Sequence, residues 1–159
     1  MKKIRLQLFL IIFILTGCLT VSSDNISTGS IEAGDPMNGN ADVIYVKAIE
    51  TNKNEWTFHV TVTHPDTGWD DYADGWNVEM EDGTVIKRYQ ISNFTRILLH
   101  PHISEQPFTR SQVGLPIPDN TQSVIVKAHD LDDGFGGKEI RVDLSKDEGD
   151  YYEVERFKN

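Results

Sequence analysis

The stretch WTFHVTVTH, residues 56–64, alternates large apolar residues with polar residues at every second position. Successive side chains of a β-strand point to opposite faces of the sheet, so this alternation predicts a strand with one face in the core. The predicted core face consists of Trp56, Phe58, Val60 and Val62, and the predicted solvent face of Thr57, His59, Thr61 and Thr63.

The same period of two recurs along most of the chain from Asp42 onward. Trp76, Val78 and Met80 alternate with polar residues, which predicts a second core strand. The pair Asp82-Gly83 supplies the positive φ angles of a tight hairpin, so Thr84–Ile91 is predicted to return antiparallel to that strand. The remaining predicted strands are Val43–Glu50, Arg96–Leu99, Pro107–Val113, Ser123–Asp130 and Lys138–Leu144.

Seven or eight short strands in about 105 residues predict an all-β, two-sheet antiparallel sandwich over residues 41–145. The segment FTRSQVGLPIPDNTQSVIVKA, residues 108–128, resembles the end of an immunoglobulin-like or fibronectin type III-like domain, where a Leu-Pro corner and a Thr precede a Val-x-Val-x-Ala strand. The tyrosine that this family places two residues after Thr121 is Ser123 here. Residues 146–159 either add an edge strand or extend away from the domain.

Charge and cysteine content exclude several classes of function. The chain has 25 Asp and Glu against 15 Lys and Arg residues, a formal net charge of −10. Such a surface repels a polyanion, which argues against nucleic-acid binding and leaves cations and cationic partners admissible. The single cysteine, Cys18, excludes an internal disulfide and a Cys-rich zinc site.

The N-terminus has the pattern of a secretory signal. Three basic residues among the first five precede an apolar run at Leu8–Leu15. A helix needs about 20 apolar residues to cross a hydrocarbon core, so residues 1–17 are predicted to be a cleaved signal peptide. Leu15-Thr16-Gly17-Cys18 resembles the lipobox of bacterial lipoproteins.

This resemblance implies lipidation of Cys18, including palmitate, and a lasting anchor on the extracytoplasmic side of the bacterial cell envelope. In that family, Leu19 in place of Asp favours the outer membrane if the cell is Gram-negative. The rest of residues 18–40 is rich in Ser, Thr, Gly and Asn, which predicts a flexible linker between Cys18 and the domain.

Four of the five histidines lie at or just beyond predicted strand ends: His64, His100, His102 and His129. In an immunoglobulin-like sandwich, the loops that follow His64 and His129 emerge at the same end, so these two side chains should be neighbours. His100 and His102 join them if Pro107–Val113 is the fifth strand, which the Leu-Pro corner favours. They lie at the opposite end if Arg96–Leu99 is that strand.

Imidazole and carboxylate groups together suit zinc, copper or nickel. The predicted metal ligands are His64, His100, His102, His129, Asp70, Asp74, Asp130 and Asp132. Calcium is the weaker expectation: Asp70, Asp74 and Glu81 match positions of the EF-hand spacing, but Tyr72 occupies another ligand position. The alternative is that these residues only end strands before proline and build turns, with no metal.

A second set of residues is predicted to form a ligand-binding surface: Asp66, Trp69, Tyr72, Phe135 and Arg110. Exposed aromatic rings beside aspartates could bind a glycan. The sequence contains no nucleophile elbow, zincin helix or phosphate loop, so an enzyme is not expected. We therefore expect a membrane-anchored binding or interaction module, with a structural envelope lipoprotein that contacts proteins through a sheet face or edge as the alternative.

Overall fold

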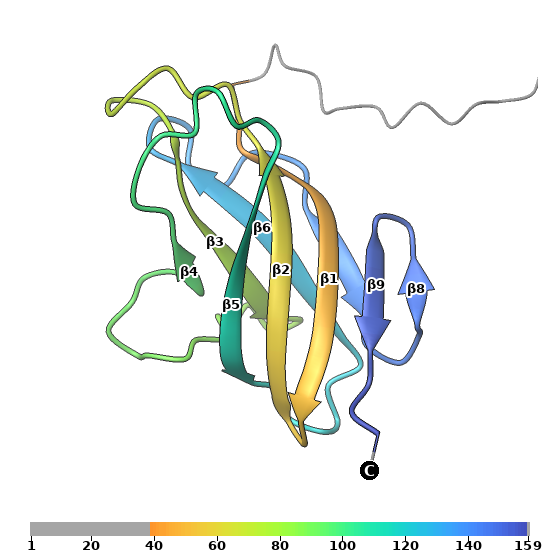
Figure 1. Cartoon of the computed structure of the whole chain (residues 1–159). Coiled ribbons are helices and arrows are strands. Elements are labelled where there is room, and N and C mark those ends of the chain that lie inside the picture. The colour runs from red at the N-terminus through yellow and green to blue at the C-terminus, as the bar shows by residue number, and fades with distance from the viewer. Residues whose placement is uncertain (1–38, 159) are drawn as a thin grey trace, which may run out of the picture. The chain divides into compact units, whose positions relative to one another are not determined.

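The computed structural model describes residues 39–158 and shows two β-sheets in this range (Figure 1). No helix long and apolar enough to cross a membrane occurs among these residues. The strands are β1 (Asp42–Asn52), β2 (Glu55–Thr63), β3 (Ala73–Met80), β4 (Arg96–Ile97), β5 (Phe108–Pro116), β6 (Ser123–Asp130), β7 (Ile140–Asp143), β8 (Glu148–Gly149) and β9 (Tyr152–Glu155).

One sheet has the strand order β5-β2-β1-β9-β8 and the other β4-β3-β6-β7. The predicted all-β, two-sheet architecture is confirmed; the immunoglobulin-like subtype stays a prediction. Residues 41–145 contain seven strands, β1–β7, and the pairs among them are antiparallel, as predicted. The C-terminal segment adds β8 and β9 to the first sheet, and β9 pairs with β1 in parallel.

Both sheets contribute to one hydrophobic core. The predicted inner face of β2 is confirmed, since Trp56, Phe58, Val60 and Val62 are at most 2% exposed. Trp76 of β3 is fully buried in the same cluster. The outer face of β2 is less exposed than expected: Thr57 is buried, and the half-buried ring of His59 forms a hydrogen bond of 2.7 Å with Ser111 Oγ.

The predicted strand Thr84–Ile91 is wrong. The turn at Gly83 forms as expected, with φ +82° and an N–H bond to the Met80 carbonyl. Only the start of the returning segment pairs with β3, where Ile86 N–H donates to Val78 O over 2.8 Å. The chain then leaves the edge of β3. Thr95 Oγ1 accepts the Val78 N–H, and β4 pairs with Gly75 and Trp76 of β3, so this edge is already occupied.

The C-terminal segment is part of the folded domain. β9 lies between β1 and β8 in the five-stranded sheet (Figure 1). Tyr152 and Val154 of β9 are buried in the common core, while the neighbouring Glu153 forms an ion pair with Lys47 of β1. Of the two alternatives for residues 146–159, the structure shows strand addition, with β8 outermost.

We expect Val154→Asp to destabilise the domain by at least about 3 kcal/mol, because it buries an unpaired carboxylate beside β1. Glu153→Gln is the matched control on the exposed face of the same strand and should cost less than about 1 kcal/mol. Urea unfolding of the two variants measures the difference. Equal unfolding midpoints would show that β9 contributes no stability.

Candidate functional site

Two strands, one from each sheet, continue their inward-facing pattern into polar residues at one end of the domain. His64 directly follows β2 and is 2% exposed, two residues beyond the buried Val62. Asp130 is the last residue of β6 and is fully buried, two residues beyond Ala128. The apolar core therefore ends in an imidazole and a carboxylate that come from opposite sheets.

This end of the domain, here called the loop end, is built by residues 64–72, 98–107 and 131–139 (Figure 1). Hydrogen bonds join these loops to one another: His102 N–H donates to Asp66 Oδ2 over 2.5 Å, and Leu131 N–H donates to Tyr72 O over 3.2 Å. The start of β1 joins them, since Ala41 N–H donates to Asp130 Oδ2 over 3.1 Å.

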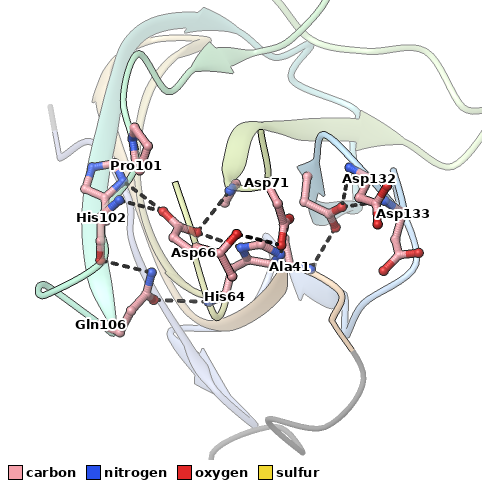
Figure 2. Close-up of polar contacts among 12 residues, drawn as sticks. Ala41, His64, Asp66, Asp71, Pro101, His102, Gln106, Asp132 and Asp133 are labelled. Atoms are coloured by element: carbon pink, nitrogen blue, oxygen red, sulfur yellow. Dashed lines mark hydrogen bonds and ion pairs between the residues drawn. The ribbon is translucent and has the colours of Figure 1, made fainter. Parts of the chain in front are cut away.

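The two nitrogens of His64 have different surroundings (Figure 2). Nδ1 lies 2.6 Å from Asp66 Oδ1 in a hydrogen bond. Nε2 is buried and has no hydrogen-bond partner, although Asp71 Oδ1 lies 3.6 Å away. Among the described residues, His64, Asp71 and Asp130 each offer one ligand atom, and these atoms lie within 4.8 Å of one another.

Asp66 holds this arrangement together. Besides the His64 ring, its carboxylate accepts the N–H of Ala73 at 3.1 Å and the N–H of His102. Its side chain is fully buried, so the three bonds replace water around the charge. The predicted role of Asp66 as part of an exposed ligand surface is wrong, because the carboxylate lies beneath the loops that it connects.

Asp130 is also fixed by backbone donors. Its Oδ1 accepts the N–H groups of Asp132 and Asp133 at 3.1 and 2.6 Å, which closes the turn after β6. Its Oδ2 accepts a hydrogen bond from the Ala41 N–H. A carboxylate oxygen has two lone pairs, so Oδ2 keeps one for a cation.

The electrostatics favour positive charge at His64. Burial by itself lowers the pKa of His64, but the hydrogen bond with Asp66 and the surrounding negative charges outweigh it, so the pKa of His64 is raised. Burial likewise opposes the charged form of Asp66, but the His64 hydrogen bond and two backbone N–H groups lower its pKa. The same negative potential attracts either a proton or a metal ion.

The arrangement has the features of a site for a divalent transition metal. A metal-binding imidazole commonly donates its other N–H to a carboxylate, and Asp66 accepts such a bond from His64 Nδ1. Ligand atoms in a tetrahedral zinc site lie about 3.4 Å apart, close to the 3.6 Å between His64 Nε2 and Asp71 Oδ1. Because the ligand atoms lie within 4.8 Å of one another, binding requires separations in the cluster to shorten by up to about 1.4 Å.

The other three predicted histidine ligands lie outside the cluster of His64, Asp71 and Asp130. His129 Nδ1 lies 2.6 Å from Asp74 Oδ1, outside the three-residue cluster, and its ring contacts Phe135. His102 stacks on Phe108 at 3.8 Å, and burial followed by the nearby positive charges lowers its pKa. His100 is exposed and lies at the loop end, with its ring 4.5 Å from that of His102.

The EF-hand spacing does not bring its residues together. Asp70 precedes β3 and Glu81 follows it, so the eight-residue strand separates them by about 25 Å. Asp74 pairs with His129, and Asp70 and Asp132 are exposed. One calcium ion cannot bridge the residues of this spacing.

The residues predicted to form a ligand surface are only partly assembled. Trp69 is 68% exposed and meets the Tyr72 ring edge-to-face at 6.0 Å. Phe135 contacts His129, with Lys127 Nζ 4.7 Å above its ring. Arg110 pairs with Glu105 at 3.1 Å. Residues 1–17, Cys18 and most of the predicted linker lie outside the described residues.

Sequence reasoning missed Asp71 as a member of the cluster and Asp66 as the group bonded to the His64 ring. One signal was available, because His64 and Asp130 each continue the buried alternation of their strands by one step. A polar residue at such a position must find a partner inside the domain. The choice of Asp71 over Asp70 depends on the path of the loop and has no signal in the sequence.

Comparisons with known proteins do not assign the chain to a family. No family model matches the chain, and no solved structure matches it. A protein of Halomicrobium mukohataei named "Putative lipoprotein" is 43% identical over 86 residues, which make up 54% of this chain and 38% of that protein. The chain thus spans well under half the length of this relative.

The His64 and Asp66 pair predicts a defined pH dependence of the metal-free domain. Because the pKa of His64 is raised, its protonation stabilises the folded domain. This stabilisation is complete below pH 6.5, the ordinary pKa of histidine, and is lost as the pH rises through the pKa in the folded state. Because the pKa of Asp66 is lowered, its ionised form stabilises the folded domain. This stabilisation is present above pH 3.8, the ordinary pKa of aspartate, and is lost as the pH falls through the pKa in the folded state. The pair should therefore stabilise most between pH 3.8 and 6.5.

Asp66→Asn should lower the free energy of unfolding by about 3 kcal/mol in this window and flatten the pH profile on both sides of it. Urea unfolding from pH 3 to 8 in chelator measures this, with the exposed Asp70→Asn as control. Parallel profiles for wild type and Asp66→Asn would contradict the assignment.

Proposed function

We propose that this protein is a membrane-tethered extracytoplasmic binding module whose loop end binds a divalent transition metal. His64 Nε2, Asp71 and Asp130 supply the protein ligands, and Asp66 orients the imidazole. The function is binding rather than catalysis.

One observation carries the metal proposal: a fully buried imidazole nitrogen without a hydrogen-bond partner lies 3.6 Å from Asp71 Oδ1, in a cluster that also contains Asp130. A buried polar atom normally finds a partner, so such an atom in a native domain requires an explanation. A metal ion at this position satisfies Nε2 and neutralises the carboxylates at once. The mixed nitrogen and oxygen set favours zinc, copper or nickel over calcium, which prefers six to eight oxygen ligands.

The N-terminal sequence and the relative support the membrane tether. Leu15-Thr16-Gly17-Cys18 follows a short apolar run with a basic start, as in lipoprotein precursors. The relative from Halomicrobium mukohataei is named as a lipoprotein. Lipidation of Cys18 would place the domain at a membrane surface of the cell envelope.

For the edge formed by β5, the alternative function, binding of a partner protein at a sheet edge, has less support than metal binding. On the edge strand β5, the carbonyl of Thr109 accepts a bond from the Arg110 side chain, and the carbonyl of Val113 accepts one from Gln112. These side chains occupy acceptors that an added strand would use.

Zinc should stabilise the domain by about 2.7 kcal/mol at a free concentration of 100 times Kd. Asp71→Asn should abolish most of this gain, because it removes one ligand. Its effect on the metal-free domain should stay below about 1 kcal/mol, since the Asp71 side chain is 33% exposed. Thermal unfolding with and without zinc, copper and nickel measures both effects.

Asp70→Asn is the matched control, because Asp70 is the neighbouring exposed carboxylate outside the cluster. It should bind zinc like the wild type. Elemental analysis of protein purified without a His tag or chelator gives the metal and its stoichiometry. If no metal copurifies and no metal shifts the melting temperature, or if both variants respond alike, this site does not bind metal.

A further inference from the structure

Exposed apolar side chains occur on all three loops of the loop end. At the loop end, each of three loops presents one or more of them: Trp69 (68% exposed), Ile103 (64%), Leu131 (46%) and Phe135 (43%). Outside the loop end, Tyr89 and Ile91 of the β3–β4 connection and Phe157 after β9 are exposed as well. Hydrophobic residues gathered on one surface indicate an interaction site.

The N-terminal part of the chain joins the domain at this same end. Ala41 is bonded to Asp130, and a Cβ atom at Gly39 would touch the Asp133 carboxylate, so residues 39–41 run along the 131–139 loop. Residues 1–38 contain the apolar run Leu8–Leu15 and Cys18. A lipid on Cys18 would therefore be connected to the domain through the loop end.

We propose that the loop end docks on the surface of the bilayer that anchors the protein, with Trp69, Ile103 and Leu131 inserted among the headgroups. This inference rests on the lipid tether of the proposed function. Tryptophan is enriched at membrane interfaces, because its ring is apolar and its N–H is polar. Apolar side chains inserted at the interface orient a peripheral domain.

Charge determines which bilayer fits. Asp70, Asp132 and Asp133 are exposed at the loop end, so the surface carries negative charge beside its apolar residues. Anionic headgroups repel such a surface, whereas zwitterionic phosphatidylcholine does not. The expected occupant is thus a zwitterionic bilayer surface.

Trp69 provides the test, because Trp56 and Trp76 are buried at 2% and 0% exposure. The full-length protein, processed in a bacterial host, is reconstituted in phosphatidylcholine vesicles with brominated acyl chains, which quench nearby tryptophan. We expect a loss of up to about one third of the emission, since Trp69 is one of three tryptophans. Trp69→Phe should remove this loss.

Ile103→Asp combined with Leu131→Asp should reduce the quenching of Trp69 at least twofold. Val113→Asp, at a 48% exposed position on β5, is the matched control and should leave it unchanged. Circular dichroism checks that each variant is folded, and an unfolded double variant is replaced by Ile103→Ser with Leu131→Ser.

Mass spectrometry of the same samples separates the two proposals. Lipidated protein without quenching would overturn the docking and leave the tether intact, and a dimer in detergent would then assign the apolar residues to contact between copies. Quenching that persists in Trp69→Phe would also overturn the docking. Protein without lipid on Cys18 would overturn the tether and, with it, this inference.

Discussion

The buried carboxylate of Asp66 is the interaction on which the loop end depends. It accepts hydrogen bonds from the His64 ring, from the backbone at the start of β3 and from the backbone of the loop that leads into β5. An ionised group in an apolar interior is tolerated only when its acceptors are satisfied, so these three segments have to meet around it. The Asp66 carboxylate thereby helps to join the five-stranded and four-stranded sheets at one end.

This constraint explains why a candidate binding site lies where the core ends. The alternation that buries Val62 and Ala128 continues to His64 and Asp130. The side chains between the sheets therefore change from apolar to polar at this end while they are still buried. Asp66 fixes one nitrogen of His64 and leaves the other directed at carboxylates. A proton and a metal ion are alternative ways to balance the same negative potential, and they compete for the same atom.

Local pattern predicted most strands, because a period of two with β-branched residues specifies a half-buried strand almost alone. It failed at Thr84–Ile91, where Thr95 and β4 occupy the strand edge that a hairpin would have used. It also left the C-terminal segment undecided, because pairing across about 100 residues has no local signal. At the site, the positions of His64 and Asp130 could be predicted from the ends of their strands. The positions of Asp66 and Asp71 depend on the path of the loop, which the sequence pattern does not specify.

The position of β9 has a consequence for the order in which the domain is completed. Among the described residues, β1 is the first strand to be synthesised and pairs with β2 soon afterwards, but its other edge is covered by β9, about 100 residues later. Until those residues emerge, β1 presents unpaired backbone groups on which another chain can add a strand. A chain that lacks β9 would keep this edge of β1 open, so the five-stranded sheet is complete only after residues 152–155 have been synthesised.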